Sequence, residues 1–127
     1  MYNKITTLHC NVVRRENINN SQILKGLLEG CILKLIDKEE TYGYKICEDL
    51  SNGGLKKVNE GTIYPILIRL EKKQLISSRK MKSALGPKRK YFTISEEGKK
   101  YLQNFENDWN AIKDVVDHFL NEEKGVE

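Results

Sequence analysis

The sequence predicts a mainly α fold with one small β-hairpin. Three stretches before residue 72 repeat apolar residues at helical spacing, two short strand-like stretches flank a Gly-Pro pair, and a long amphipathic stretch follows. Three helices, a hairpin and one more helix form the order of a winged helix-turn-helix domain with a C-terminal helix. At 127 residues the chain suits a single domain with a modest core.

The first helix is expected to begin after Ser21, whose side chain can cap its first turn. Its apolar residues recur in pairs four apart, which indicates one broad buried stripe. The second, shorter helix has Thr41 as its expected cap and stops before Asn52 and the pair Gly53-Gly54. The stripe of the first helix comprises Ile23, Leu24, Leu27, Leu28, Cys31, Ile32, Leu35 and Ile36.

The third helix begins near Asn59, whose side chain can accept a hydrogen bond from a free backbone N–H. Pro65 lacks an N–H and crowds the carbonyl of Gly61, so the first turn is expected to be kinked or to start late. The inward stripe has the spacing i, i+3, i+4, i+7. It consists of Ile63, Ile66, Leu67 and Leu70.

Residues 75–82 and 88–94 are predicted to be two short strands. The five residues between them end in Gly86 and Pro87, which favour a turn over a continued strand. This hairpin is the predicted wing.

The last helix is expected to run from its cap, Ser95, to about Asn121. From Phe105 onward its apolar residues follow steps of 4, 3, 4 and 3, the alternation of a coiled-coil seam. Residues 1–95 hold 18 Lys and Arg against 9 Asp and Glu, whereas residues 96–127 hold 4 against 9. We therefore expect this acidic helix to face away from any polyanion and to pair with a second copy. The seam comprises Phe105, Trp109, Ile112, Val116 and Phe119.

Between Lys72 and Lys90 the chain carries eight basic residues and no acidic one. Duplex DNA offers closely spaced phosphates, so clustered Lys and Arg gain by releasing counterions, while a neighbouring helix reads base edges. A solvated charged face is the simpler alternative. A helix followed directly by a basic hairpin favours DNA binding.

These features divide the chain into an N-terminal arm (1–20), a winged helix-turn-helix DNA-binding domain (21–95) and a C-terminal dimerisation helix (96–127). No stretch approaches the roughly 20 apolar residues needed to span a bilayer, and the first residues lack a secretory signal. We therefore expect a cytoplasmic protein that does not bind a membrane.

The cysteines and histidines indicate neither a metal site nor an enzyme. The three cysteines lack metal-ligand spacing, so no metal or other cofactor is expected, and Cys31 and Cys47 are expected to be small core residues. His9 and His118, the two histidines of the sequence, belong to no recognisable arrangement of nucleophile, base or metal ligand. Catalysis is therefore not expected.

Four segments of the sequence form one ordered pattern. They are Gln22-Ile-Leu-Lys-Gly-Leu-Leu-Glu-Gly30, Thr41-Tyr-Gly-Tyr-Lys-Ile46, Asn59-Glu-Gly-Thr-Ile-Tyr-Pro65 with Arg69-Leu-Glu71, and Gly86-Pro-Lys-Arg-Lys-Tyr-Phe92 running into Ser95-Glu-Glu-Gly98. Together they resemble the PadR family of bacterial transcriptional regulators, in its compact subgroup with a single helix after the wing, and the resemblance covers roughly residues 22–120. It implies a homodimer whose paired reading helices meet a near-palindromic DNA operator. Members mostly repress transcription, and some release DNA on binding a small aromatic compound.

Candidate DNA contacts on the third helix are Thr62 and Tyr64 in its leading turn, with Arg69 as a further candidate. Thr offers a hydroxyl and a methyl, and Tyr a hydroxyl on a rigid arm, although both residue types also serve in caps and packing. By the resemblance, Tyr42 touches the DNA backbone, whereas Tyr44 belongs to the core.

Lys88, Arg89 and Lys90 lie where the wing returns. Alternation along a strand puts Lys88 and Lys90 on one face and Arg89 on the other, so the three cannot all make one kind of contact. We expect at least one to contact phosphate or the minor groove.

Phe105 and Trp109 lie on the apolar face of the last helix. In multidrug-sensing relatives an aromatic residue of this helix lines a cavity that stacks planar drugs, so the resemblance implies a small aromatic effector at these two residues. Simple packing in a domain or dimer core is the favoured alternative. From a different class, the chain could be a protein-interaction adaptor whose basic hairpin meets an acidic surface without DNA.

Overall fold

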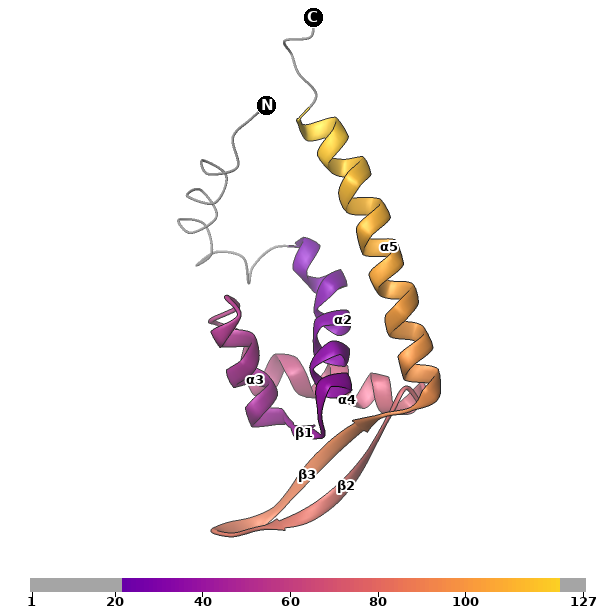
Figure 1. Ribbon diagram of the computed structural model, residues 1–127. Helices are drawn as coiled ribbons and strands as arrows, with labels where there is room; N and C mark the ends of the chain where they lie inside the picture. The colour runs from indigo at the N-terminus through magenta and orange to yellow at the C-terminus, as the bar shows by residue number, and fades with distance from the viewer. Residues whose placement is uncertain (1–21, 122–127) are drawn as a thin grey trace, which may run out of the picture.

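In the computed structural model, which describes residues 22–121, four helices pack together beside a three-stranded antiparallel sheet, whose hairpin projects away from them (Figure 1). This arrangement confirms the mainly α class predicted from the sequence. The expected arm and its neighbour Ser21 lie outside the described residues. The elements are α2 (Gln22–Lys38), β1 (Thr41–Tyr42), α3 (Gly43–Asn52), α4 (Glu60–Lys72), β2 (Ile76–Ser83), β3 (Gly86–Ile94) and α5 (Glu96–Leu120).

One hydrophobic core joins the helices to the sheet, with α2 packed against α3, α5 and β3. The inward stripe predicted for the third helix is confirmed, because all four of its members in α4 are buried. The largest fully buried side chains are Phe92, Ile32, Leu33, Ile36, Ile46, Ile63, Leu67 and Leu70.

The buried face of α2 differs from the stripe predicted for it. Leu33 is fully buried, whereas Ile23 is 71% exposed and Cys31 is also exposed. Because α2 is covered by neighbours on several sides, its buried surface is wider than one stripe and is displaced from the predicted one. The expectation that Cys31 is a core residue is wrong; it lies at a cavity between helices instead.

The sheet contains a third strand, β1, which the sequence did not predict. The strand order is β1-β3-β2, and Thr41 of β1 lies opposite Phe92. Thr41 is therefore a buried strand residue rather than a helix cap, and α3 begins at Gly43 after Tyr42, whose side chain makes no capping hydrogen bond. A strand of two residues is too short to show an alternation in the sequence.

The hairpin is longer, and its turn shorter, than expected. Ser83 pairs with Gly86, which leaves Ala84 and Leu85 as the turn. Gly86 and Pro87 consequently belong to β3 rather than to the turn. Because β1 pairs with β3 only near its other end, the part of β3 at Pro87 has one open edge, where a missing N–H is tolerated.

Both predicted caps of the later helices are confirmed. The side chain of Asn59 accepts a 3.1 Å hydrogen bond from the backbone N–H of Thr62, and α4 then runs from Glu60 through Pro65 without a late start. Ser95 Oγ accepts a 2.9 Å hydrogen bond from the N–H of Gly98 in α5. The two caps fix where α4 and α5 begin.

The start of α5 is also tied to the short segment between α4 and β2. The hydroxyl of Ser95 lies 2.8 Å from the carbonyl oxygen of Gln74 and 3.0 Å from that of Leu75, to which it can donate. A side chain at Gly98 would collide with the Leu75 carbonyl, so glycine permits this close approach. None of the helices within residues 22–121 is both long and apolar enough to cross a membrane.

Candidate nucleic-acid interface

The register of β2 and β3 assigns the basic residues of the wing to two faces. Lys80 lies directly opposite Lys90, two residues from the buried Phe92, so these side chains share one face. Arg79 and Arg89 occupy the alternate positions and belong to the other face. Like charges directly opposite each other destabilise a hairpin, so the lysine pair favours a surface adapted to an anion.

Glu71, near the end of α4, joins this helix to both strands of the hairpin. Its Oε2 accepts a 2.6 Å hydrogen bond from Ser78 Oγ in β2, and its Oε1 lies 3.4 Å from Lys90 Nζ in β3. The Lys90 ammonium also lies 5.7 Å from the ring centre of Phe92. One carboxylate therefore fixes the wing against α4 and partly compensates the charge of Lys90.

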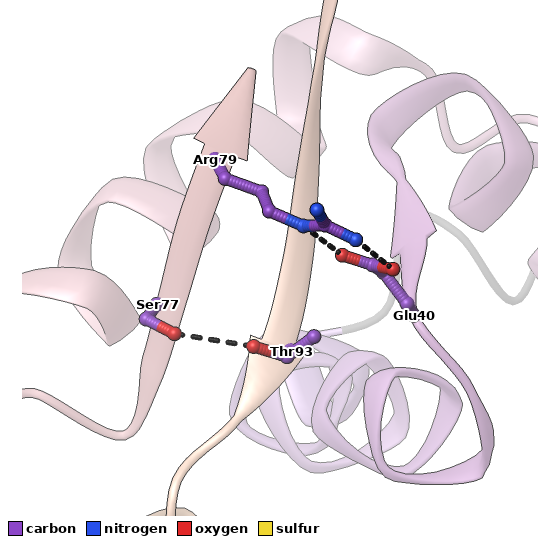
Figure 2. Close-up of polar contacts among 4 residues, drawn as sticks. All are labelled: Glu40, Ser77, Arg79 and Thr93. Carbon is purple, nitrogen blue, oxygen red and sulfur yellow. Dashed lines mark hydrogen bonds and ion pairs between the residues drawn. The ribbon is translucent and has the colours of Figure 1, made fainter. Parts of the chain in front are cut away.

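On the opposite face, Arg79 reaches from β2 across β3 to Glu40, which precedes β1 (Figure 2). Its Nε and Nη2 donate to the two carboxylate oxygens at 2.8 and 2.9 Å. These hydrogen bonds hold the pKa of Glu40 below its ordinary value. Farther along the hairpin, the hydroxyls of Ser77 and Thr93 lie 3.1 Å apart. The Glu40–Arg79 pair thus connects the two edges of the sheet.

Tyr42 and Arg89, both predicted to contact DNA, lie against each other on this same face. The Arg89 guanidinium carbon is 4.3 Å from the Tyr42 ring centre, and Tyr42 packs edge-on against Tyr91 at 5.1 Å. The cation–π contact and the ring pair link β1 to β3.

Lys88 has the most open environment of the three predicted wing contacts. It is exposed, and within residues 22–121 no ion pair engages its ammonium group, whereas Lys90 is paired with Glu71. Between the pairs Met81–Arg89 and Ser83–Gly86 the register shifts, so Lys88 lies at an irregularity of β3 where the alternation of faces is interrupted. It is therefore the wing residue best placed to gain from a phosphate.

Thr62 and Tyr64 lie in the first two turns of α4. Thr62 is exposed and Tyr64 is 40% exposed. A Cβ at Gly43 in α3 would lie 2.7 Å from the Tyr64 hydroxyl, so glycine is needed for this packing. Partial burial raises the pKa of Tyr64, with a smaller contribution from Glu60. Tyr64 therefore packs α4 onto α3 while keeping part of its ring in solvent.

Arg69 belongs to a separate cluster centred on Glu29 of α2. Glu29 Oε2 lies 3.5 Å from Arg69 Nε and 3.8 Å from Lys73 Nζ, and its Oε1 accepts a 3.0 Å hydrogen bond from the Tyr101 hydroxyl of α5. That hydrogen bond raises the pKa of Tyr101. Glu29 thereby connects α4 to α5, and a DNA contact by Arg69 must compete with it.

Two exposed residues near these candidate contacts were not among the contacts predicted from the sequence. Tyr44 was expected in the core but is 66% exposed in the first turn of α3. The buried positions of α3 are Gly43, Ile46 and Leu50, a spacing that places Tyr44 off the buried face and that could have found it. Lys80 became a candidate only once its register opposite Lys90 was known.

Phe105 and Trp109, the predicted ligand residues, have different surroundings. Phe105 lines a cavity of about 380 Å³ between α2, α3 and α5, whose lining does not include Trp109. Trp109 is 40% exposed, so it is not buried within its own subunit. Packing of Trp109 against a second subunit stays a prediction. Among residues 22–121 no group of three His, Cys, Asp or Glu side chains could hold a metal ion.

Comparison with known proteins places the chain in a family. Residues 32–104 match the Transcriptional regulator PadR-like family. The crystal structure of a PadR-like transcriptional regulator from Bacillus cereus is 45% identical, with 79% of this chain and 97% of that chain covered and a TM-score of 0.71. A PadR family transcription regulator from Clostridium difficile is 33% identical, covering 74% of this chain and 98% of that chain, with a TM-score of 0.65. An uncharacterized protein of Lysinibacillus sphaericus is 36% identical over 102 residues, 79% of this chain and 94% of that protein. The chain therefore belongs to the PadR-like family of transcriptional regulators, which bind DNA.

Proposed function

We propose that the protein is a repressor that binds a near-palindromic operator as a homodimer. The observation that carries the proposal is the lysine face of the wing, on which Lys80 and Lys90 lie opposite each other and Glu71 connects that face to α4. Residues 21–95 then act as the DNA-binding domain and 96–127 as the dimerisation helix. Because the target is chromosomal DNA, the expected location is the cytoplasm.

In this proposal α4 enters the major groove with its first turn leading, so that Thr62 and the exposed edge of Tyr64 approach bases. The wing lysines, Lys88 and Lys90, contact phosphates or the minor groove. Tyr42 and Arg89, which lie against each other, contact the DNA backbone beside this groove. Arg69 contributes where phosphate displaces Glu29 as its partner.

The second half of α5 supports the homodimer. From residue 107 to 120 every residue of the helix is exposed, including large apolar ones between 40 and 76% exposed. An apolar stripe of this kind is removed from water when a second helix packs on it. These residues are Trp109, Ile112, Val115, Val116, Phe119 and Leu120.

The effector part of the proposal is release of the operator by a small flat aromatic compound at Phe105 and Trp109. Its support is that Phe105 lines an apolar cavity and that Trp109 follows one helical turn later. Quenching of the Trp109 fluorescence by candidate compounds, followed by operator titration with and without them, is the measurement. A compound that quenches but leaves operator affinity unchanged would contradict release.

The repressor proposal is tested by measuring affinity for the DNA upstream of the gene as salt is raised. A variant with Lys88, Arg89 and Lys90 replaced by glutamine should bind more weakly, and its logarithmic salt slope should be shallower by about 0.9 for each phosphate that the variant no longer neutralises. Lys113→Gln, on exposed α5, is the matched control and should change neither quantity. Equal affinity and equal slope for the triple variant and the wild type would reject the proposal.

A further inference from the structure

We infer that α4 recognises its operator through apolar contacts, with Pro65 and Ile68 packing against the C5-methyl groups of thymines in the major groove. The inference rests on the operator binding of the proposed function and specifies what the helix recognises there. The recognised groups are the methyls of A·T pairs rather than the hydrogen-bonding edge of guanine.

The first observation is the direction in which these two side chains leave the helix. The core lies on the side of the buried stripe, Ile63, Ile66, Leu67 and Leu70. Because successive residues are about 100° apart around a helix, four positions lie within roughly 30° of the opposite direction. These exposed positions, which we call the outer strip, are Gly61, Pro65, Ile68 and Lys72. Thr62 and Tyr64 leave the helix roughly 70–90° to either side of the strip. Its centre therefore carries no side-chain group that can form a hydrogen bond.

The second observation is that Pro65 and Ile68 are both unfavourable choices for the isolated subunit. Pro65 lies inside α4 and has no N–H to donate to the carbonyl of Gly61. Ile68 is 51% exposed, so about half of an apolar side chain stays in water. The two residues are three apart and adjoin on one helix face. Departures of this kind from local preference occur at functional sites.

The third observation is that cations border the outer strip. Lys56 and Lys57 are exposed in the loop before α4, and Lys72 is exposed at its last turn. On the hairpin side, Glu71 connects Lys90 to the helix. A major groove has thymine methyls on its floor and phosphates along both walls. An apolar centre with cationic borders matches this distribution.

The carboxylates of α4 do not interrupt the strip. The helix has two of them, Glu60 and Glu71. Glu71 is engaged by Ser78 and Lys90. Glu60 is partly buried and leaves the helix roughly 110° away from the centre of the strip. Neither charge therefore faces an incoming duplex at Pro65 and Ile68.

This arrangement excludes the usual polar readers from the centre of the contact. Guanine is read by Arg or Lys and adenine by Asn or Gln. The guanidinium of Arg69 lies to the side of the strip and is engaged by Glu29. An apolar side chain gains instead by removing a thymine methyl from water, which is equivalent to about fourfold in affinity for each methyl. One methyl in each half-site of a homodimer would contribute about fifteenfold.

Replacing thymine by uracil tests the inference, because it removes the C5-methyl and leaves every hydrogen-bonding group of the base. The DNA upstream of the gene is amplified once with dTTP and once with dUTP, and each fragment is titrated with the full chain. The wild type should bind the uracil fragment at least about fifteenfold more weakly. The double variant Pro65→Ala with Ile68→Ala should bind both fragments alike, at about the affinity of the wild type for uracil DNA.

The double variant should fold, because both side chains are exposed and alanine is the best helix former. Leu85→Ala is the matched control. Leu85 is 97% exposed in the turn of the hairpin, so its substitution also removes apolar surface from the DNA-binding domain. The thymine methyl is displayed only in the major groove, and the hairpin is proposed to contact phosphates or the minor groove. Leu85→Ala should therefore keep the wild-type ratio between the two fragments.

The outcomes separate this inference from the proposed function. If the wild type protected one specific site equally well on both fragments, the inference would be overturned and the repressor proposal would stand. A double variant that kept the wild-type ratio would also overturn it, because the methyls would then be sensed elsewhere. If the wild type bound the thymine fragment no better than unrelated DNA, operator binding itself would fail.

Discussion

Replacing Glu71 with glutamine should weaken folding and at the same time strengthen non-specific DNA binding. The carboxylate of Glu71 holds Ser78 at 2.6 Å and Lys90 at 3.4 Å, so it stabilises the junction between α4 and the wing. The same carboxylate neutralises Lys90 on the face proposed to meet phosphates. The substitution keeps an acceptor for Ser78 and removes only the charge.

The size of each effect follows from these contacts. A hydrogen bond to a charged group contributes about 1.5–3 kcal/mol, and a neutral one about 0.5–1.5 kcal/mol. In the ion pair, the side chain of Glu71 is 35% exposed and that of Lys90 is 42% exposed. Because solvent screens it, this pair adds at most about 1 kcal/mol. Glu71→Gln should therefore lower the free energy of unfolding by about 1–2 kcal/mol. Releasing Lys90 should steepen the logarithmic salt slope for random duplex DNA by about 0.9.

Urea unfolding and a salt series with random duplex DNA measure the two quantities. Ser78→Ala is the matched control, because it removes the hydrogen bond without changing any charge; it should lower stability and leave the salt slope unaltered. If Glu71→Gln left the slope unchanged, or weakened non-specific binding, Lys90 would not be the phosphate ligand that its position indicates.

Three further predictions concern the body of the subunit. Gly30→Ala should lower the free energy of unfolding by about 1–3 kcal/mol, because the added methyl collides with an aromatic ring of α5, whereas Gly26→Ala, with open space around it, should raise it by up to about 1 kcal/mol; urea unfolding distinguishes them. Gln74, just after α4, has a φ of 63°, which is strained for a residue with a side chain. Gln74→Gly should therefore raise the free energy of unfolding by about 1 kcal/mol, and a lower midpoint of urea unfolding would contradict this strain. Because Arg79 lowers the pKa of Glu40, this pair stabilises the fold above the ordinary carboxylate pKa and the contribution is lost as pH falls through the lowered value; Glu40→Gln should therefore differ from wild type at neutral pH and converge with it in acid, as followed by amide exchange in the wing.

Much of this fold was predictable because its signals are local. Asn59 and Ser95 act within one helical turn, and the α4 stripe has four residues at helical spacing, so both the caps and the helical period were visible in the sequence. The missing features depend on long-range pairing. β1 forms only because β3 passes beside it, and the Glu40–Arg79 pair joins residues 39 positions apart.

The same distinction holds for the candidate interface. The composition of the wing indicated a basic surface, but whether a given cation is available depends on its neighbours in space. Lys90 and Arg69 are engaged by Glu71 and Glu29, and Arg89 by an aromatic ring, whereas Lys88 has no such partner among residues 22–121. Residue spacing in a single sequence does not predict which acidic or aromatic side chain will lie beside each cation.

The most direct test of the account is a footprint of the purified protein on the DNA upstream of its gene. Two protected half-sites, related by a dyad and separated centre to centre by about one helical turn of roughly 10 base pairs or a multiple of it, are the predicted result. Uniform weak protection at every sequence would contradict an operator-binding dimer. So would the absence of protection at concentrations where the protein binds an acidic protein partner, and that result would favour a protein-interaction adaptor.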